Sequence, residues 1–269
     1  MAVVLDARDL TKHFGAVTAA LNVGAAIEQD SVVGLIGTNG AGKTTFINMI
    51  TGYIKPDSGS IVYRGRDITA LSPREITRIG ICRSFQVPQL YSSLSVYENM
   101  MVGLGVVLHN ARLGGFFSRN RPNVPGYDAP AEEVAERILD RFGLSDYRDK
   151  NAQVLPGGVR KLLDIALTMV AKPAILLLDE PTSGVSAEEK FGMMDMVMAA
   201  VKAEGATVLF VEHDMEVVSR FAERVLAFYD GRIIADATPE IVLADPEVKR
   251  YVVGGELHRM DGQRDKANA

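Results

Sequence analysis

Apolar residues fall into two kinds of pattern along the chain. Uninterrupted apolar runs at 32–36, 175–178 and 207–211 are typical of strands buried on both faces of a parallel sheet. Residues 3–30 instead alternate and turn as β-strands do, and a further short strand is expected at 60–63. Apolar residues at helical spacing follow at 131–142 and 162–170. The pattern predicts an α/β protein with a region of β-strands near the N-terminus.

Cap and turn residues predict several boundaries. Ser72-Pro73 predicts the start of a helix, and a short strand is expected at 79–85. Ser186 and Glu189 have the spacing of a capping box, which predicts a helix that opens at Ser186 and runs to residue 204. Asp230-Gly231 between two apolar runs predicts a hairpin.

The irregular stretch lies at 105–130, where glycine, proline and arginine interrupt the apolar spacing, and it predicts an inserted loop. No internal repeat is evident, and only one phosphate-binding motif occurs. We expect one nucleotide-binding domain over 1–254, with its helical part at about 88–165. The polar segment 255–269 predicts a disordered tail.

Composition narrows the class of protein. The formal net charge of −5 disfavours a general nucleic-acid binder, because no basic stripe could neutralise a run of phosphates. Cys82 is the single cysteine, which excludes a disulfide framework and cysteine-type metal sites and suits a reducing compartment. No signal peptide is expected. The longest apolar runs fall short of the ~20 residues that span a bilayer.

A phosphate loop follows the first buried strand. Its sequence is Gly37-Thr38-Asn39-Gly40-Ala41-Gly42-Lys43-Thr44-Thr45, which fits the pattern G-x-x-x-x-G-K-[ST]. The glycines let backbone N–H groups surround phosphates, and the following helix N-terminus favours negative charge there. Lys43 is expected to reach the β/γ-phosphate oxygens, and Thr44 to bind Mg²⁺. A glycine-rich turn that binds nothing is the alternative, and the strand and helix on either side disfavour it.

Two adjacent carboxylates follow the second buried strand. Asp179 ends the apolar run 175–178, a position from which a carboxylate can hold Mg²⁺. Glu180 comes next and could orient the water that attacks the γ-phosphate. His213 follows the third buried strand and could reach the same phosphate. The alternatives are a solvated acidic turn and a structural histidine.

Seven segments together resemble the ATP-binding subunit of ABC transporters, from Val3 to about Gly254. In chain order they are Phe14, the loop 37–45, Gln86, Leu155-Pro156-Gly157-Gly158, the run 175–181, Ser183-Gly184-Val185-Ser186 and His213. The resemblance implies a P-loop NTPase core of the RecA-like kind with an antiparallel β subdomain and an α-helical subdomain. It also implies that the chain binds and hydrolyses ATP with Mg²⁺.

The resemblance implies a role for each matching segment. Phe14 would stack on adenine, and Gln86 would sense Mg²⁺ and the membrane partner. Residues 155–158 would form the signature loop, which reaches ATP held by the opposite subunit, and 183–186 would contact their counterpart across the dimer. The implied metal ligands are Thr44, Gln86 and Asp179, and the implied catalytic residues are Glu180 and His213.

Further features resemble the longer ATPase of branched-chain amino acid importers. They are the segment Arg83-Ser84-Phe85-Gln86, the insertion at 105–130, the segment Val211-Glu212-His213-Asp214-Met215, and the C-terminal segment from Asp245 to Gly254. The resemblance implies a heterodimer with a second ATPase subunit, two membrane permease subunits and, indirectly, a periplasmic binding protein. It places the chain peripherally on the cytoplasmic face of the inner membrane, where it would energise import of small hydrophobic amino acids.

Two departures from the family pattern concern what this chain gives to its partner. Pro156 and Val159 replace the usual serine and polar residue of the signature, and Ser186 replaces an aspartate. Importers of urea, amides or aromatic acids share the marks of the subfamily. A lipopolysaccharide or lipid transporter is disfavoured by the insertion. A soluble ABC ATPase of DNA repair or translation would have coiled coils or two nucleotide cores.

Overall fold

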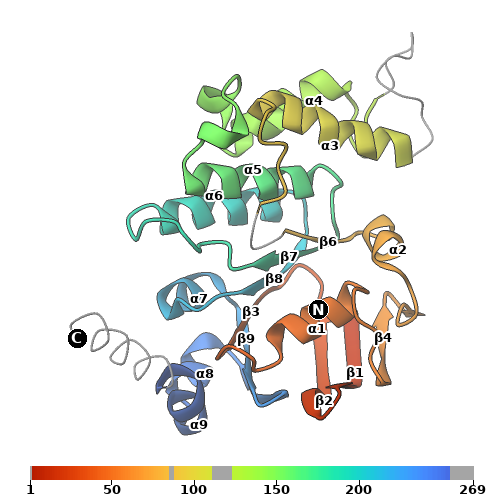
Figure 1. Cartoon of the computed structure of the whole chain (residues 1–269), viewed down its shortest axis with the longest axis vertical. Helices are drawn as coiled ribbons and strands as arrows, with labels where there is room; N and C mark the ends of the chain where they lie inside the picture. The colour runs from red at the N-terminus through yellow and green to blue at the C-terminus, as the bar shows by residue number, and fades with distance from the viewer. Residues whose placement is uncertain (1, 85–87, 111–122, 255–269) are drawn as a thin grey trace. The chain divides into compact units, whose positions relative to one another are not determined.

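The computed structural model describes residues 2–84, 88–110 and 123–254. The chain forms two compact units (Figure 1), and we describe each in turn. Unit 1 comprises residues 1–81 and 207–269, and unit 2 comprises residues 82–206.

A largely parallel sheet forms the centre of unit 1. Its strands lie in the order β10 (Arg232–Ala237), β9 (Arg224–Tyr229), β3 (Val32–Gly37) and β8 (Thr207–Val211). β3 runs parallel to both β8 and β9, which confirms the prediction from its apolar run, because a central strand is buried on both faces. The predicted hairpin at Asp230-Gly231 joins β9 to β10.

Five helical segments complete this part of unit 1. α1 (Lys43–Ile50) packs Phe46 against Phe228 of β9, with ring centroids 5.5 Å apart. α7 (Met215–Phe221) begins at Asp214, whose carboxylate accepts hydrogen bonds from the backbone N–H groups of Glu216 and Val217. α8 (Pro239–Ala244), α9 (Pro246–Val248) and a π-helical turn (Lys249–Val253) follow β10.

The predicted antiparallel subdomain is the second sheet of unit 1. Its strands lie in the order β2 (Val17–Glu28), β1 (Val3–Phe14), β4 (Ser58–Tyr63) and β5 (Arg66–Asp67). β1 is the central long strand and pairs antiparallel with both β2 and β4. α2 (Pro73–Arg78) begins with the expected N-cap: Ser72 and Glu75 form a reciprocal capping box, and proline occupies the first turn.

Unit 2 is mainly helical. β6 (Ile81–Arg83) leads into it and pairs with β7 (Ile175–Asp179). α3 (Val96–Asn110) packs on α4 (Ala131–Arg141) and α5 (Gly157–Met169), and α5 packs on α6 (Lys190–Ala203) (Figure 1). Two short 3₁₀ turns, Ser145–Tyr147 and Ala152–Val154, connect α4 to α5.

Two predicted boundaries were wrong. Residues 105–110 are helical rather than irregular, because Met100, Leu104 and Leu108 are buried at a four-residue spacing that extends α3. The helix expected from Ser186 begins only at Lys190. Ser186 does bond Glu189, as a capping box requires, but it closes an isolated turn before the helix. Gln86, 111–122 and the tail 255–269 lie outside the described residues.

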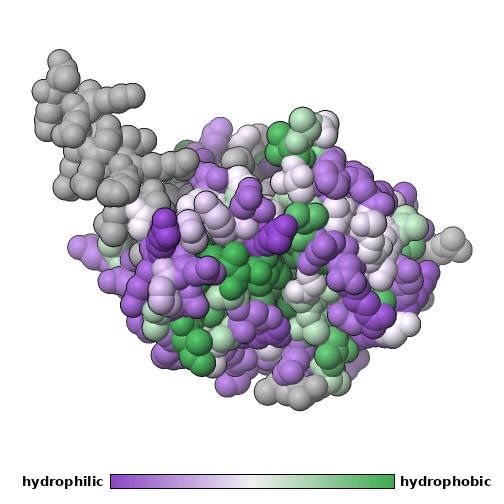
Figure 2. Space-filling model, turned by 90° about the horizontal axis from the view of Figure 1, so that it is seen from below, coloured by the Kyte–Doolittle hydropathy of each residue, from purple (hydrophilic) through white to green (hydrophobic). Residues whose placement is uncertain are grey.

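Figure 2 shows hydrophilic side chains interspersed with separate hydrophobic patches on one face. Within residues 2–84, 88–110 and 123–254, every helix is too short or too polar to cross a membrane.

Candidate functional site

Two glycines of the phosphate loop are required by their surroundings in unit 1. Gly37 ends β3 with φ +150°, and a Cβ there would lie 2.5 Å from the carbonyl oxygen of Phe228. Gly42 has φ +107°, and its Cβ would lie 2.7 Å from the carbonyl oxygen of Ala19 in β2. The backbones of β9 and β2 therefore hold the loop at both ends, and only glycine permits the approach.

Lys43 lies across the loop that it follows. Its ammonium donates hydrogen bonds to the carbonyl oxygens of Gly37 (2.5 Å) and Thr38 (3.1 Å), and the residue is only 6% exposed. α1 starts at this lysine without an acidic residue in its first turn and without a side-chain cap on its N-terminus. Thr44, by contrast, is exposed. An N-terminus of this kind, with a lysine beside it, favours an anion.

His213 lies at the same edge of the unit 1 sheet as the phosphate loop. β3 and β8 are parallel, and Leu35 is opposite Val211, so both strands end toward the same side. Glu212 donates its backbone N–H to the Leu35 carbonyl at 3.4 Å, which continues the pairing to the residue before the histidine. The ring is partly exposed. This register brings His213 to the loop edge, as its position after a buried strand predicts.

Phe14 lies at the end of β1, before the turn into β2, and it is 49% exposed. It is therefore not a core aromatic. Its hairpin also carries Ala19, whose carbonyl oxygen approaches Gly42. The aromatic ring and the phosphate loop thus belong to directly contacting segments of unit 1.

In unit 2, Asp179 ends the fully buried strand β7. Its Oδ2 lies 2.5 Å from Nη2 of Arg83 in β6, and the two side chains are 12% and 10% exposed. Lys161 of α5 donates a hydrogen bond to the Asp179 carbonyl oxygen at 3.4 Å. Arg83 was missed from the sequence, although an arginine within a short apolar strand is a signal of a buried ion pair.

Glu180 has an unusual backbone conformation, with φ +47°. A non-glycine residue in the left-handed region stores strain, which concentrates at functional sites. The turn after it is closed by backbone hydrogen bonds from Ser183 to Glu180 and from Val185 to Thr182. The chain therefore turns sharply after β7, and Glu180 leaves the line of the strand that carries Asp179.

The segment 155–158 forms the entry to α5. Leu155 is buried, and Pro156 is the N-cap residue, so Gly157 begins the helix. A Cβ on Gly157 would meet the carbonyl oxygen of Gly184 at 3.4 Å, and one on Gly158 would contact Val185. The structure thus brings the predicted signature loop against the predicted dimer-contact loop 183–186.

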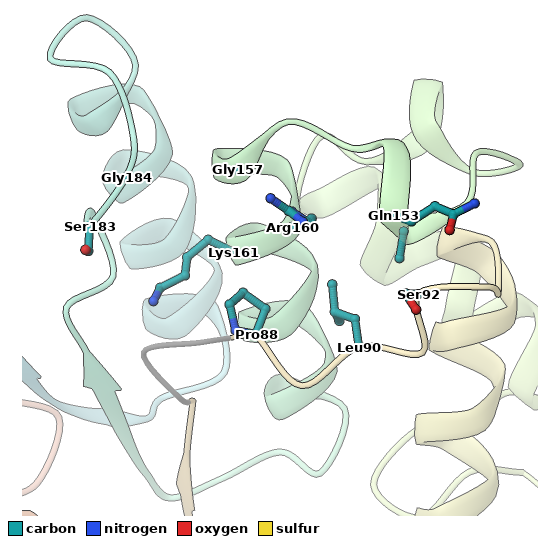
Figure 3. Close-up of a pocket in the computed structure, with 10 residues that line it drawn as sticks. Pro88, Leu90, Ser92, Gln153, Gly157, Arg160, Lys161, Ser183 and Gly184 are labelled. Atoms are coloured by element: carbon teal, nitrogen blue, oxygen red, sulfur yellow. The ribbon is translucent and has the colours of Figure 1, made fainter.

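A cavity of about 380 Å³ lies beside this helix entry (Figure 3). Its walls come from the segment after β6, the second 3₁₀ turn, α5 and the loop after β7. Lys161 extends from α5 between Pro88 and the loop that carries Ser183, and Leu90 lies on the same side as Pro88. The cavity thus joins the segment after Gln86 to both predicted inter-subunit loops.

Asn99 and Asp164 of unit 2 were also not predicted from the sequence. The amide of Asn99 bonds the backbone of Tyr91, Leu94 and Ser95, so one buried side chain holds a five-residue loop. Asp164 accepts a hydrogen bond from the backbone N–H of Gln89 at 3.0 Å. Both are buried polar residues in helices, and such residues commonly satisfy backbone groups of irregular segments.

Comparison with known proteins agrees with this geometry. The family model described as ABC transporter matches residues 21–183. The chain is 32% identical over 256 residues to a probable branched-chain amino acid transport ATP-binding protein LivG of Archaeoglobus fulgidus, covering 94% of this chain and 96% of the relative. It is also 32% identical over 251 residues to the high-affinity LivG of Escherichia coli, with 93% and 98% covered.

Solved structures give the same assignment. The ATP-binding cassette MJ1267 of an ABC transporter superposes with a TM-score of 0.80 at 30% identity, covering 93% of this chain and 99% of the cassette. The ADP conformation of MJ1267 gives a TM-score of 0.78 at the same identity, covering 93% and 98%. The fold is that of a P-loop NTPase with an antiparallel β subdomain and helices. The chain belongs to the ABC transporter family, as one of its ATP-binding ATPase subunits.

Proposed function

We propose that the chain hydrolyses ATP to energise a membrane importer of branched-chain or other small hydrophobic amino acids. The phosphate loop carries the proposal: Gly37 and Gly42 fix its backbone, and Lys43 spans it with an ammonium bound only 2.5 Å from a loop carbonyl. The relatives named above supply the amino acid class.

The loop suits the triphosphate of ATP. The proposed contacts are Gly37, Thr38, Asn39, Gly40, Ala41, Gly42, Lys43, Thr44 and Thr45. Gly40 has φ +82° and open space where a Cβ would stand, so its backbone can approach a phosphate closely. Lys43 would exchange its hydrogen bonds to Gly37 and Thr38 for phosphate oxygens, so a charged donor gains a charged acceptor.

The residues present also suit Mg²⁺. Among residues 2–84, 88–110 and 123–254, no group of three or more His, Cys, Asp or Glu side chains could hold a metal. Mg²⁺ in nucleotide sites needs only one or two carboxylates, because phosphates and water supply the other ligands. We propose Asp179, the Thr44 hydroxyl and Gln86 as its protein ligands. The ion would neutralise charge on the phosphates.

Glu180 and His213 are the proposed catalytic residues. Glu180 would accept a proton from the attacking water, and the sharp turn after β7 turns it away from the strand axis. His213 would donate a hydrogen bond to the γ-phosphate from the edge at which β3 and β8 end. Phe14, half-exposed on a hairpin that contacts Gly42, would stack on adenine.

Partners follow from the exposed segments of unit 2. A second, different ATPase subunit would contact Pro156, Gly157 and the loop 183–186. The reason is that Leu155, Pro156, Gly157 and Gly158 occupy the position of the family's signature loop. The permease subunits would be contacted through the surface near residues 86–91, where Tyr91 is 59% exposed. A periplasmic binding protein would act on those permeases. The chain would lie on the cytoplasmic face of the inner membrane.

We further propose two unequal ATP sites. Pro156 lacks the hydroxyl that a serine would offer to the γ-phosphate, and a hydrogen bond to a charged group contributes about 1.5–3 kcal/mol, or roughly 10- to 150-fold. The weaker site would be on the partner's phosphate loop. ATP on Lys43 of this chain would meet the partner's own signature.

Tagged protein tests these proposals after purification from membranes of its source. Two permeases and a second ATPase should co-purify, and vesicles holding the complex should accumulate leucine when ATP is supplied on the ATPase side. Accumulation of urea or an aromatic acid, but not leucine, would reject the amino acid class.

Glu180→Gln should bind ATP and lose about 10²–10³-fold in hydrolysis. It should also reduce uptake more than the matching change in the partner; equal losses would reject the asymmetry.

A further inference from the structure

Asp57 holds the end of β1 in unit 1. The last paired residues of β1 and β4 are Thr11 and Ser58, so β1 continues beyond β4 by three residues. Asp57 directly precedes the first residue of β4, and its carboxylate lies beside the part of β1 that β4 does not pair with. Its Oδ2 accepts the backbone N–H of His13 at 2.7 Å, and its Oδ1 accepts the Lys12 ammonium at 2.6 Å. A side chain therefore supplies the acceptor that a longer strand would have provided.

The turn that carries Asp57 is itself tightly held. The backbone N–H of Asp57 donates to the Thr11 carbonyl at 2.8 Å. Gly59 follows with φ +92°, and a Cβ there would lie 2.5 Å from the carbonyl oxygens of Arg8 and Asp9. Hydrogen bonds from Lys12 and from the His13 backbone hold the pKa of Asp57 at about 2, so the carboxylate is ionised at neutral pH. We call Asp57, with its bonds to the Lys12 ammonium and the His13 backbone, the Asp57 clamp. Its carboxylate is charged, and the turn holds it in place beside the end of β1.

Lys12 connects this clamp to Phe14. The register of β1 against β2 shifts between Lys12 and His13, and the two side chains on either side of this irregularity, Lys12 and Phe14, lie next to each other. The Lys12 ammonium lies over the Phe14 ring, 5.7 Å from its centroid, while it is bound to Asp57. This distance is within the range of a cation–π contact. The aromatic ring at the hairpin end is thus fixed by its neighbour, and 49% of the residue stays exposed.

The same hairpin is joined to the phosphate loop by backbone contacts. Leu21 of β2 donates to the carbonyl of Gly231, and Gly231 donates to the carbonyl of Ala41 in the loop. A ring held rigidly on the hairpin is therefore held at a defined place relative to the loop. Rigid presentation lowers the entropy lost when a ligand binds.

We propose that Asp57 is a positioning residue for the nucleobase, which acts through Lys12 and the His13 backbone to hold the Phe14 ring ready to stack on adenine. The inference rests on the proposed function of Phe14, and it adds a specific residue that contacts neither phosphate nor base. The phosphate loop binds the triphosphate without this clamp. Asp57 therefore contributes to binding of ATP and not to binding of inorganic tripolyphosphate.

The test compares calorimetric affinities for ATP and for inorganic tripolyphosphate. Phe14→Ala should weaken ATP binding by about 5- to 150-fold, the range for stacking of one base on an aromatic ring. Asp57→Ala should lose about 3- to 10-fold, since it loosens the ring without removing it. Lys12→Met should lose less, because the His13 hydrogen bond remains. Tripolyphosphate affinity should stay within about twofold for all three.

A double variant and a matched control make the test decisive. Asp57→Ala should cost nothing further in a Phe14→Ala background, because its effect passes through the ring. Asp67→Ala removes another bonded carboxylate of the same sheet, one that accepts from Thr69, and should leave ATP affinity unchanged. Additive losses in the double variant, or an equal loss of tripolyphosphate affinity, would overturn the role of Asp57. If Phe14→Ala left the ATP affinity unchanged, the proposed stacking itself would be overturned.

Discussion

The ion pair between Arg83 and Asp179 provides a quantitative test of how unit 2 is stabilised. Both side chains are nearly nine-tenths buried, and Nη2 lies 2.5 Å from Oδ2. Replacing Arg83 with methionine keeps much of the apolar stem but leaves the carboxylate buried without this cation. Loss of one member of a buried pair typically costs 3–5 kcal/mol. We expect about 3 kcal/mol, the lower end, because Asp179 ends its strand and keeps 12% exposure.

Urea unfolding followed by circular dichroism measures this loss, since the chain has no tryptophan to report by fluorescence. Asp179→Asn in the same background removes the unpaired charge. The double variant should therefore be more stable than the sum of the single losses predicts, by at least about 1.5 kcal/mol.

Arg141→Met is the matched control for this cycle. Arg141 pairs with Glu204 at 2.5 Å but is 43% exposed, and Glu204 keeps a second contact with Lys172 at 3.2 Å. An exposed pair of this kind contributes less than about 1 kcal/mol. If Arg83→Met costs no more than Arg141→Met, or if the cycle is additive, the pair does not stabilise unit 2 in the way that its burial implies.

Three further predictions concern local features. Gly37→Ala should lower the free energy of unfolding by about 2–4 kcal/mol through its backbone clash, whereas Gly40→Ala, with open space around it, should lose only about 1–2 kcal/mol. Asn99→Ala should speed amide hydrogen exchange in residues 91–95 and cost about 2–4 kcal/mol, and Asn99→Asp should cost at least as much, because a buried carboxylate oxygen would face the carbonyl oxygens to which the amide now donates. Burial raises the pKa of Cys82 to about 11, so at pH 8 the native thiol should react with Ellman's reagent about 200-fold more slowly than the unfolded one. Because the native state keeps this proton to higher pH than the unfolded state, stability should fall as pH rises from about 8.5 toward 11. Equal rates for native and unfolded protein would contradict this last prediction.

Much of the fold could be predicted because burial on two faces leaves an unmistakable pattern. β3, β7 and β8 each came from an uninterrupted apolar run, and the structure buries nearly every residue of the three. The phosphate loop could be predicted for a different reason. Its local backbone geometry requires glycines at fixed positions, and these give a short sequence motif. Chemistry that depends on one segment is readable from one segment.

Features that depend on two distant segments were not readable in this way. Nothing near Arg83 in sequence indicates that its partner is residue 179, and nothing near Asp57 indicates that its carboxylate continues the pairing of β1. The exposure of Phe14 also depends on a distant segment, because β1 extends three residues beyond its pairing with β4 and the residue there is 49% exposed. Tertiary pairing decides such positions, and single-sequence patterns do not contain it.

Pro156 shows how the structure changes the meaning of a sequence departure. Compared with the usual serine, proline lacks both the hydroxyl and the backbone N–H. The structure makes it the N-cap of α5 with φ −54°, which its ring favours, and the N–H of an N-cap residue is not needed by the helix. What is lost is the hydroxyl that would cap the first turn. The backbone N–H groups of Gly157 and Gly158 then have no side-chain cap, and Gly157 is exposed. A loop of this kind keeps backbone donors for a phosphate on the partner, so we expect the substitution to weaken that contact rather than abolish it.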